Sequence, residues 1–194
     1  AYEFALPSNE RRPLEKNDEI RVRHDGPLHY RAWSILEPPP PDALAATYSA
    51  PPGAPPDGDP YRQLPPEITA ATRAKAEEIV AGATSDYAKA VRLRDWLQTN
   101  LSYTLDLRDP DGREPIDYFL FERRAGHCEY FASAFAIMGR VVGLRTRSVN
   151  GFLGGEWNEY DGYIAVRAGD AHSWTEVYFE GQCPSCWFQR QGSW

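Results

Sequence analysis

The spacing of apolar residues changes at Gly143, and this change is the strongest constraint on how the chain can fold. Upstream of Gly143, apolar residues recur at intervals of three and four, which is the spacing of one face of a helix. These residues are Cys128, Phe131, Phe135, Met138 and Val142. The pattern predicts a helix that begins at Cys128 and ends at Gly143, because glycine commonly stops a helix.

Downstream of Gly143 the sequence has the alternation and the glycine-rich turns of β-strands. Strands are predicted at residues 145–152, 163–167 and 173–179. Helices followed by an antiparallel sheet make an α+β fold. The sequence therefore predicts a helical part followed by a sheet, with the change between them at Gly143.

Two further helices are predicted upstream. Residues 69–81 are rich in Ala, Glu and Lys and stop at Gly82. A second helix is expected to start at Ser85 or Asp86, either of which can cap it, and to run to about Asn100. Its apolar face consists of Tyr87, Val91, Leu93, Trp96 and Leu97. Residues 116–121 are apolar enough for a short buried helix.

The N-terminal third differs in kind from the rest. Residues 20–23 and 28–33 alternate apolar and polar side chains, which predicts two strands joined by a turn at Gly26-Pro27. Prolines crowd residues 37–66, and we expect neither helix nor central strand there. The sequence thus predicts an extended arm at 1–36, a proline-rich linker at 37–66 and a core at 67–194.

Composition excludes several classes of function. The formal net charge is −7 and no basic run occurs, so nucleic acid is not an expected partner. No apolar stretch approaches the roughly 20 residues of a membrane span, and no secretion signal begins the chain. We therefore expect a soluble chain, although a piece excised from a membrane protein would have the same features.

No metal or cofactor site is predicted. Cys183 and Cys186 form a C-x-x-C pair, but no second pair or histidine cluster completes a zinc site. No cluster of Asp and Asn has the spacing of calcium ligands. Three cysteines are also too few for a disulfide framework.

Cys128 is the candidate nucleophile. A thiol must ionise to attack, and a free cysteine has a pKa of about 8.5, which a helix N-terminus or a nearby imidazolium can lower. Cys128 stands at the first turn of the predicted helix, after a Gly126 that permits a sharp bend. Its backbone amide can then help to bind an oxyanion. The alternative is a small buried apolar cysteine with no chemistry.

His172 is the candidate base. It lies at the head of a predicted strand, in Asp170-Ala-His-Ser-Trp-Thr-Glu-Val-Tyr178. A strand end can direct an imidazole toward a helix start, although a single histidine on a strand is more often structural. Only the joint pattern of cysteine and histidine favours the catalytic interpretation.

Three segments in order resemble the transglutaminase-like superfamily: Arg124-Ala-Gly-His-Cys-Glu-Tyr-Phe-Ala132, Val142-Gly-Leu-Arg-Thr-Arg-Ser-Val-Asn-Gly-Phe152 and the His172 segment. Within it, the chain is most similar to bacterial membrane-anchored proteins with a large periplasmic domain. That likeness includes Tyr61-Arg-Gln-Leu-Pro65 and a turn at Gly155-Glu-Trp-Asn158. The resemblance spans about residues 61–182.

The resemblance implies a papain-like core in which Cys128, at a helix N-terminus, packs on an antiparallel sheet that carries His172. It implies a thioester intermediate that Cys128 forms with a carboxamide, while His172 moves the proton. Tyr103 corresponds to an aromatic position that can donate to the oxyanion, or it is a core aromatic. Trp174 and Glu176 are expected to pack and to orient the histidine strand. The implied location is the periplasmic domain of an inner-membrane protein.

The sequence departs from the family after Gln182. The family's third group is an Asp that orients the imidazole, and the usual interval from His172 leads to Phe188. No Asp or Glu follows Glu180. Either residues 183–194 are not native, which we favour, or a polar side chain such as Gln189 replaces the acid. Asp170 is too near His172 in sequence for that role, and we expect it to serve a turn.

The predicted function is thiol-dependent acyl transfer on carboxamides, with protein-glutamine γ-glutamyl transfer as the leading case. Its partners would be a glutamine donor and a primary-amine acceptor. A cysteine peptidase or amidase of the same fold is the alternative, because only the acceptor of the thioester differs. A non-catalytic binding module is the other alternative, because the acid of the triad is missing. The sequence does not distinguish the transferase from the hydrolase.

Overall fold

The computed structural model describes part of the chain, namely residues 2–5, 11–13, 31–34, 40–45, 58–106, 108, 110–179 and 187–188. The chain divides into two compact units, Ala1–Pro40 and Pro41–Trp194. The second unit contains all the candidate site residues.

The first unit holds a three-stranded antiparallel sheet in the order β2-β1-β3. Its strands are β1 (Tyr2–Ala5), β2 (Arg11–Pro13) and β3 (Arg31–Ser34). β3 overlaps the strand predicted at 28–33, and it pairs with β1. The other predicted strand at 20–23 and the Gly26-Pro27 turn lie outside the described residues.

The proline-rich segment contains a short helix, α1 (Pro41–Ala45), so the prediction that no helix forms within 37–66 was wrong at this point. Proline is favoured at the first position of a helix, where its missing N–H needs no partner. The four residues after Pro41 contain no proline. Leu44 of α1 is buried in the core of the second unit, which gives the helix its packing.

The two predicted upstream helices are confirmed. α2 (Ala70–Val80) is capped by Thr69, whose side chain accepts from the Thr72 N–H. α3 (Asp86–Asn100) is capped by Ser85, whose side chain accepts from the Ala88 N–H. These caps satisfy N–H groups that the helix itself leaves without partners.

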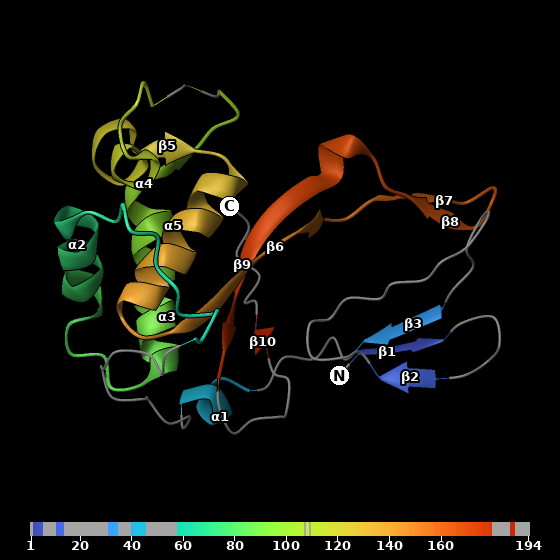
Figure 1. The fold of residues 1–194 in the computed structure, drawn as a ribbon. Helices are drawn as coiled ribbons and strands as arrows, with labels where there is room; N and C mark the ends of the chain where they lie inside the picture. The colour runs from blue at the N-terminus through green and yellow to red at the C-terminus, as the bar shows by residue number, and fades with distance from the viewer. Residues whose placement is uncertain are drawn as a thin grey trace. The chain divides into compact units, whose positions relative to one another are not determined.

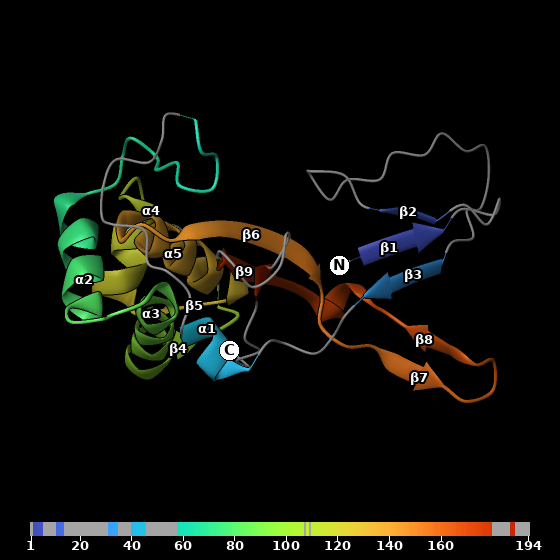
Figure 2. The same cartoon turned by 90° about the horizontal axis from the view of Figure 1, so that it is seen from below.

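The centre of the second unit is α5 (Cys128–Val141), followed by the antiparallel strands β6 (Arg145–Phe152) and β9 (Ala171–Tyr178). A third strand, β10 (Trp187–Phe188), pairs with β9 and gives the order β10-β9-β6. α5 packs on β6 and β9 on one side and on α2 and α3 on the other (Figures 1 and 2). The predicted α+β class is confirmed.

Two hydrogen bonds fix α5 on the sheet. The hydroxyl of Thr146 on β6 donates to the carbonyl of Ala136 over 3.0 Å, and that of Thr175 on β9 donates to the carbonyl of Ala132 over 2.7 Å. Thr146 and Val177 pair across the ladder, and both are buried. The sheet face that carries Thr175 and Val177 therefore faces α5.

The shorter elements depart from the predictions. The apolar segment at 116–121 forms one turn of α-helix, α4 (Pro115–Asp117), and then a π-helix (Tyr118–Arg123), and Phe121 at its end is exposed. The predicted turn at 155–158 is mostly strand β7 (Glu156–Asn158), which pairs with β8 (Tyr163–Ala165). The turn follows Asn158, whose side chain accepts from the N–H groups of the next loop.

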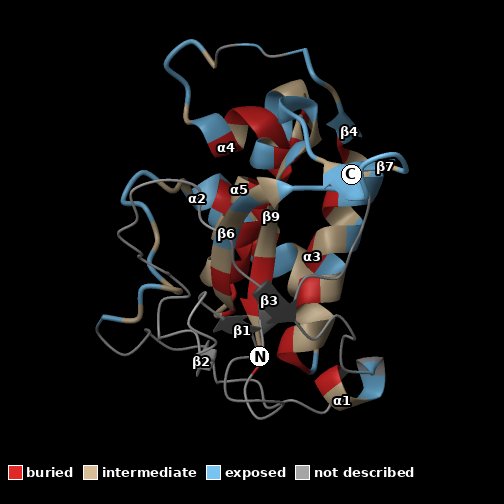
Figure 3. Ribbon diagram, turned by 90° about the vertical axis from the view of Figure 1, so that its right-hand side faces the viewer, coloured by how far each residue is buried: buried red, intermediate tan, exposed pale blue. Residues whose placement is uncertain are grey.

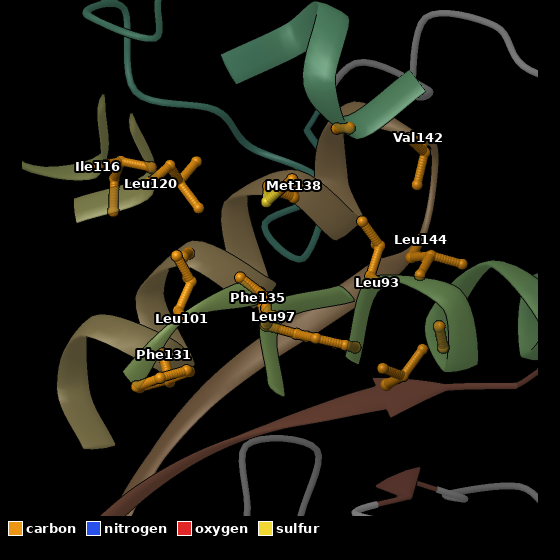
Figure 4. Packing of buried hydrophobic residues seen from close by; sticks show 14 of the residues in the cluster. Leu93, Leu97, Leu101, Ile116, Leu120, Phe131, Phe135, Met138, Val142 and Leu144 are labelled. Atoms are coloured by element: carbon orange, nitrogen blue, oxygen red, sulfur yellow. The ribbon is translucent and has the colours of Figure 1, made fainter. Parts of the chain in front are cut away.

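The buried residues gather where α5, α3 and β9 meet (Figure 3). Figure 4 shows Leu93 and Leu97 of α3 packed against Phe135 and Met138 of α5. All five apolar residues that predicted the helix from Cys128 to Val142 are buried. The period in the sequence thus identified the face that forms the core.

We predict that Leu97→Ala lowers the free energy of unfolding by about 2–5 kcal/mol, because it leaves a cavity among side chains that cannot fully collapse. Leu97 is 0% exposed, whereas Leu105 is 76% exposed, so Leu105→Ala is the matched control. Urea titration of both variants measures the difference. Equal stability of the two would contradict this description of the core.

Candidate active site

Cys128 is the first residue of α5 and is a free, buried cysteine. His127 caps the helix, since its Nδ1 accepts from the Glu129 N–H over 3.4 Å. The His127 and Tyr130 rings pack edge to face, with centroids 5.1 Å apart. The sulfur therefore lies in the first turn of a capped helix, where the unpaired N–H groups and the positive end of the helix dipole are located.

Gly126 serves close packing and not the sharp bend that the sequence suggested. A Cβ at this position would lie 2.8 Å from Cβ of Tyr130 and 3.0 Å from the Phe119 ring. Its φ is not in the left-handed region. The backbone just before Cys128 therefore runs directly against two aromatic residues, which leaves no room for a side chain.

Tyr103 reaches Cys128 through a short pair of parallel strands. β4 (Ser102–Tyr103) pairs with β5 (Ala125–Gly126), and Tyr103 lies opposite Gly126. The Tyr103 ring stacks on Phe131 of α5, with centroids 6.4 Å apart. The chain is turned into β5 by Arg124, which has the left-handed φ of 54° after the π-helix. Two segments far apart in sequence thus meet at the nucleophile.

Cys128 acts on the ionisation of the Tyr103 hydroxyl. The pKa of the phenol is raised above its ordinary value, first by burial and then by the charge of an ionised Cys128 and a hydrogen bond with its side chain. A hydrogen bond with the Cys128 backbone acts in the opposite direction. With a raised pKa, the phenol keeps its proton at neutral pH and remains a hydrogen-bond donor.

His172 is the second residue of β9 and lies at the same end of the α5–β9 layer as Cys128. The bond from Thr175 to Ala132 aligns the two elements. Cys128 is one helical turn before Ala132, about 6 Å. His172 is three residues before Thr175, about 10 Å. Because α5 and β9 run in the same direction, both candidate residues precede this fixed point.

Cys128 and His172 do not hydrogen-bond to each other in the described part of the chain. Side chains alternate along a strand, so His172 shares a face with Trp174, on the opposite side from Thr175. The His172 and Trp174 rings are stacked, with centroids 6.4 Å apart and planes 22° apart. The imidazole is partly buried beside the indole. The structure therefore brings Tyr103 to the sulfur, and it brings Trp174 to the imidazole.

The sequence profile of the transglutaminase-like superfamily matches residues 73–192, which is more than half of the chain. The chain belongs to this superfamily. The match begins within α2 and ends after β10, and so includes Cys128, Tyr103 and His172.

Three known proteins are similar to this chain in sequence or in structure. It is 36% identical over 118 residues to a protein-glutamine gamma-glutamyltransferase of Pseudomonas aeruginosa and 30% identical over 132 residues to the uncharacterized protein YebA of Bacillus subtilis. These stretches are 60% and 64% of this chain, but only 17% and 18% of the relatives. The crystal structure of the periplasmic domain of TgpA from Pseudomonas aeruginosa matches with a TM-score of 0.59 and 32% identity, over 66% of this chain and 43% of that one.

An ion pair between Glu176 and Arg147 joins β9, the strand of His172, to β6. Glu176 is buried, and its Oε1 accepts from the indole Nε1 of Trp174 over 3.2 Å. Its Oε2 accepts from Nε and Nη2 of Arg147 over 2.8 Å and 2.7 Å. Arg147 and Glu176 are partners across the β6–β9 ladder. Trp174 and Glu176 were expected to pack and to orient this strand, whereas Arg147 was not singled out.

No carboxylate among the described residues hydrogen-bonds to His172. Asp170 serves a turn, as expected, because its Oδ2 accepts from the Arg167 N–H over 2.7 Å. Phe188, at the position where the family's usual spacing from His172 would place the orienting Asp, is in β10. Gln189 and the pair Cys183 and Cys186 lie outside the described residues. No group of three or more metal-binding side chains occurs in the part of the chain that the structure covers.

Sequence reasoning missed how Tyr103 reaches Cys128. A two-residue strand carries no period, so the β4–β5 pairing left no signal of its own. The tight packing at Gly126 also depends on Phe119 and Tyr130, which come together only in the fold. The glycine in Arg124-Ala-Gly-His-Cys128 was the one available signal.

We predict that Gly126→Ala lowers the free energy of unfolding by about 1–3 kcal/mol, because the added methyl group overpacks against Tyr130 and Phe119. Gly169→Ala is the matched control, since nothing lies within 4 Å of a Cβ built there. Thermal and urea unfolding measure both variants. A Gly126→Ala protein as stable as the control would show that the backbone before Cys128 is not tightly packed.

Proposed function

We propose that this chain catalyses thiol-dependent acyl transfer on carboxamides, as a protein-glutamine γ-glutamyltransferase. The observation that supports it best is the position of Cys128 in the first turn of the capped helix α5, beside Tyr103, which the β4–β5 pairing places opposite Gly126. A nucleophile thus stands beside two hydrogen-bond donors, which is the arrangement that stabilises an oxyanion. The name of the Pseudomonas aeruginosa relative supports the choice of glutamine as acyl donor.

In the first step, the Cys128 thiolate attacks the carbonyl carbon of a glutamine side chain. The carbonyl oxygen becomes an oxyanion, which receives hydrogen bonds from the Cys128 N–H and the Tyr103 hydroxyl. His172 carries the proton that Cys128 gave up and delivers it to the departing nitrogen. The C–N bond breaks, ammonia leaves, and a thioester joins the glutamyl carbon to the sulfur.

In the second step, a primary amine attacks the thioester while His172 accepts its proton. The C–S bond breaks, the amide product leaves, and the thiolate is restored. Water in place of the amine gives hydrolysis, which is the reaction of a peptidase or amidase of this fold. For either acceptor the His172 imidazole must approach the sulfur more closely than in the described structure. Catalytic hydrogen bonds commonly tighten only when substrate is bound.

We further propose that this chain is part of a periplasmic domain of a membrane-anchored protein. The structural relative TgpA is described as a periplasmic domain, and the chain spans less than a fifth of its curated relatives. No helix in the described residues is long and apolar enough to cross a membrane. The division into an arm at 1–36, a linker at 37–66 and a core at 67–194 remains part of this proposal.

We predict that the chain incorporates a labelled primary amine into a glutamine-containing protein such as casein, and that Cys128→Ser lowers the rate at least about 10³-fold. Ammonia release and amine incorporation are measured together. Equal amounts of both support transfer. Ammonia or peptide release without incorporation identifies a hydrolase, and no turnover with an unreactive Cys128 identifies a binding module.

We predict that Tyr103→Phe lowers kcat about 10²-fold with little change in KM, because one oxyanion donor is lost. Since the pKa of Tyr103 is raised, its proton stays in place and the deficit should be constant from about pH 6 to about pH 9. Tyr163→Phe, at an exposed tyrosine of β8, is the control. A Tyr103→Phe enzyme with normal kcat would remove Tyr103 from the oxyanion site.

A further inference from the structure

We propose that Trp174, held in place by Glu176 and Arg147, is a positioning residue that sets the plane of the His172 imidazole. This inference rests on the proposed function, because it concerns how the base of that reaction is oriented. It assigns roles to three residues of the β6–β9 ladder, Gly151, Arg147 and Glu176, that do not touch the substrate.

The contact between the two rings is the starting point. Trp174 and His172 are two residues apart on β9, so their side chains leave the strand on the same face. Their rings lie 22° from parallel, with centroids 6.4 Å apart, which is within the range of offset stacking. An indole beside an imidazole restricts rotation of the smaller ring, because a turned imidazole would lose this contact.

The indole can act as a template only if it is itself fixed, and a buried ionic group fixes it. Its Nε1 donates to Glu176 Oε1 over 3.2 Å. The second oxygen of Glu176 accepts from two nitrogens of Arg147, over 2.8 Å and 2.7 Å. Such charge-assisted bonds are among the stronger hydrogen bonds in proteins. Glu176 is buried and therefore costly to leave without these partners.

Gly151 bounds the indole from the neighbouring strand. It pairs directly with His172 in the β6–β9 ladder. A Cβ on Gly151 would lie 2.7 Å from Cη2 and 3.0 Å from Cζ3 of Trp174. The indole therefore occupies the space that a side chain would fill at this position. Any residue larger than glycine would push the indole away from its present plane.

The stack takes over part of what an orienting acid does. In a Cys-His-Asp site the acid fixes both the orientation and the charge of the imidazole. No carboxylate among the described residues bonds to His172, and Trp174 supplies orientation without charge. A displaced indole should therefore lower kcat, because the imidazole is misoriented, while substrate binding is unchanged.

The test combines Trp174→Ala, Trp174→Phe and Gly151→Ala, with Trp157→Phe and Gly169→Ala as controls. Trp157 is exposed on β7, and Gly169 has open space around it. We measure kcat and KM for amine incorporation, the thermal unfolding temperature, and the rate of Cys128 alkylation by iodoacetamide against pH, with His172→Ala as reference. Trp174→Phe keeps a ring but loses the bond to Glu176, so it should fold even where Trp174→Ala does not.

We expect kcat to fall about 10-fold to 100-fold in Trp174→Phe and Gly151→Ala, with KM unchanged, because a small misplacement of a catalytic group has this effect. Their alkylation profiles should move toward that of His172→Ala. Folded variants with the kcat and the profile of the original chain would overturn the proposal. A lower unfolding temperature without a moved profile would also overturn it, since it would show a structural role only.

The two proposals fail in different ways. If the original chain incorporates no amine while Trp174→Phe still moves the alkylation profile, the positioning role stands and the transferase proposal fails. If amine is incorporated equally by Trp174→Phe and the original chain, the transferase proposal stands and the positioning role fails.

Discussion

The candidate site depends on the way α5 is fixed to the sheet. Two threonine hydroxyls, on β6 and β9, donate to carbonyls of α5 near its middle and its first turns. Hydrogen bonds of this kind oppose the sliding of a helix along a sheet, because a shift would leave both hydroxyls without acceptors. Apolar packing alone would tolerate such a shift far better. The positions of Cys128 and His172 along the α5–β9 interface, relative to each other, are therefore set by polar contacts inside a mostly apolar interface.

The second constraint is the approach of β4 to the start of α5. The π-helix and the left-handed Arg124 turn the chain so that β5 runs beside β4, and Gly126 lets the backbone of β5 lie against Tyr130 and Phe119. Tyr103 is thereby placed at the same sulfur that α5 presents at its first turn. The helix start and the tyrosine come from separate parts of the core, so the proposed oxyanion donors are assembled by the fold and not by a local motif.

The sequence was sufficient where structure is local and periodic. α3 begins after the predicted cap Ser85, α5 begins at Cys128, and β6 has the predicted bounds. It failed where a short segment depends on distant partners. The many prolines in residues 37–66 led to the prediction that no helix forms there. Proline disrupts the interior of a helix but is favoured at its first position, and α1 begins at Pro41. The pairing of β4 with β5 and the bond from Arg147 to Glu176, 29 residues apart, left no pattern along the chain.

The His172 ring is held by contacts that run across the β6–β9 ladder. The indole, the buried carboxylate and the guanidinium form a chain of contacts that begins at Arg147 on β6 and ends at the His172 ring. The proposed effect of this network is to restrict the motion of the imidazole. A stacked ring also permits sliding within its plane, which a hydrogen-bonded acid does not. The proposed reaction requires the imidazole to advance toward the sulfur when substrate binds, and a ring held by stacking alone permits that movement.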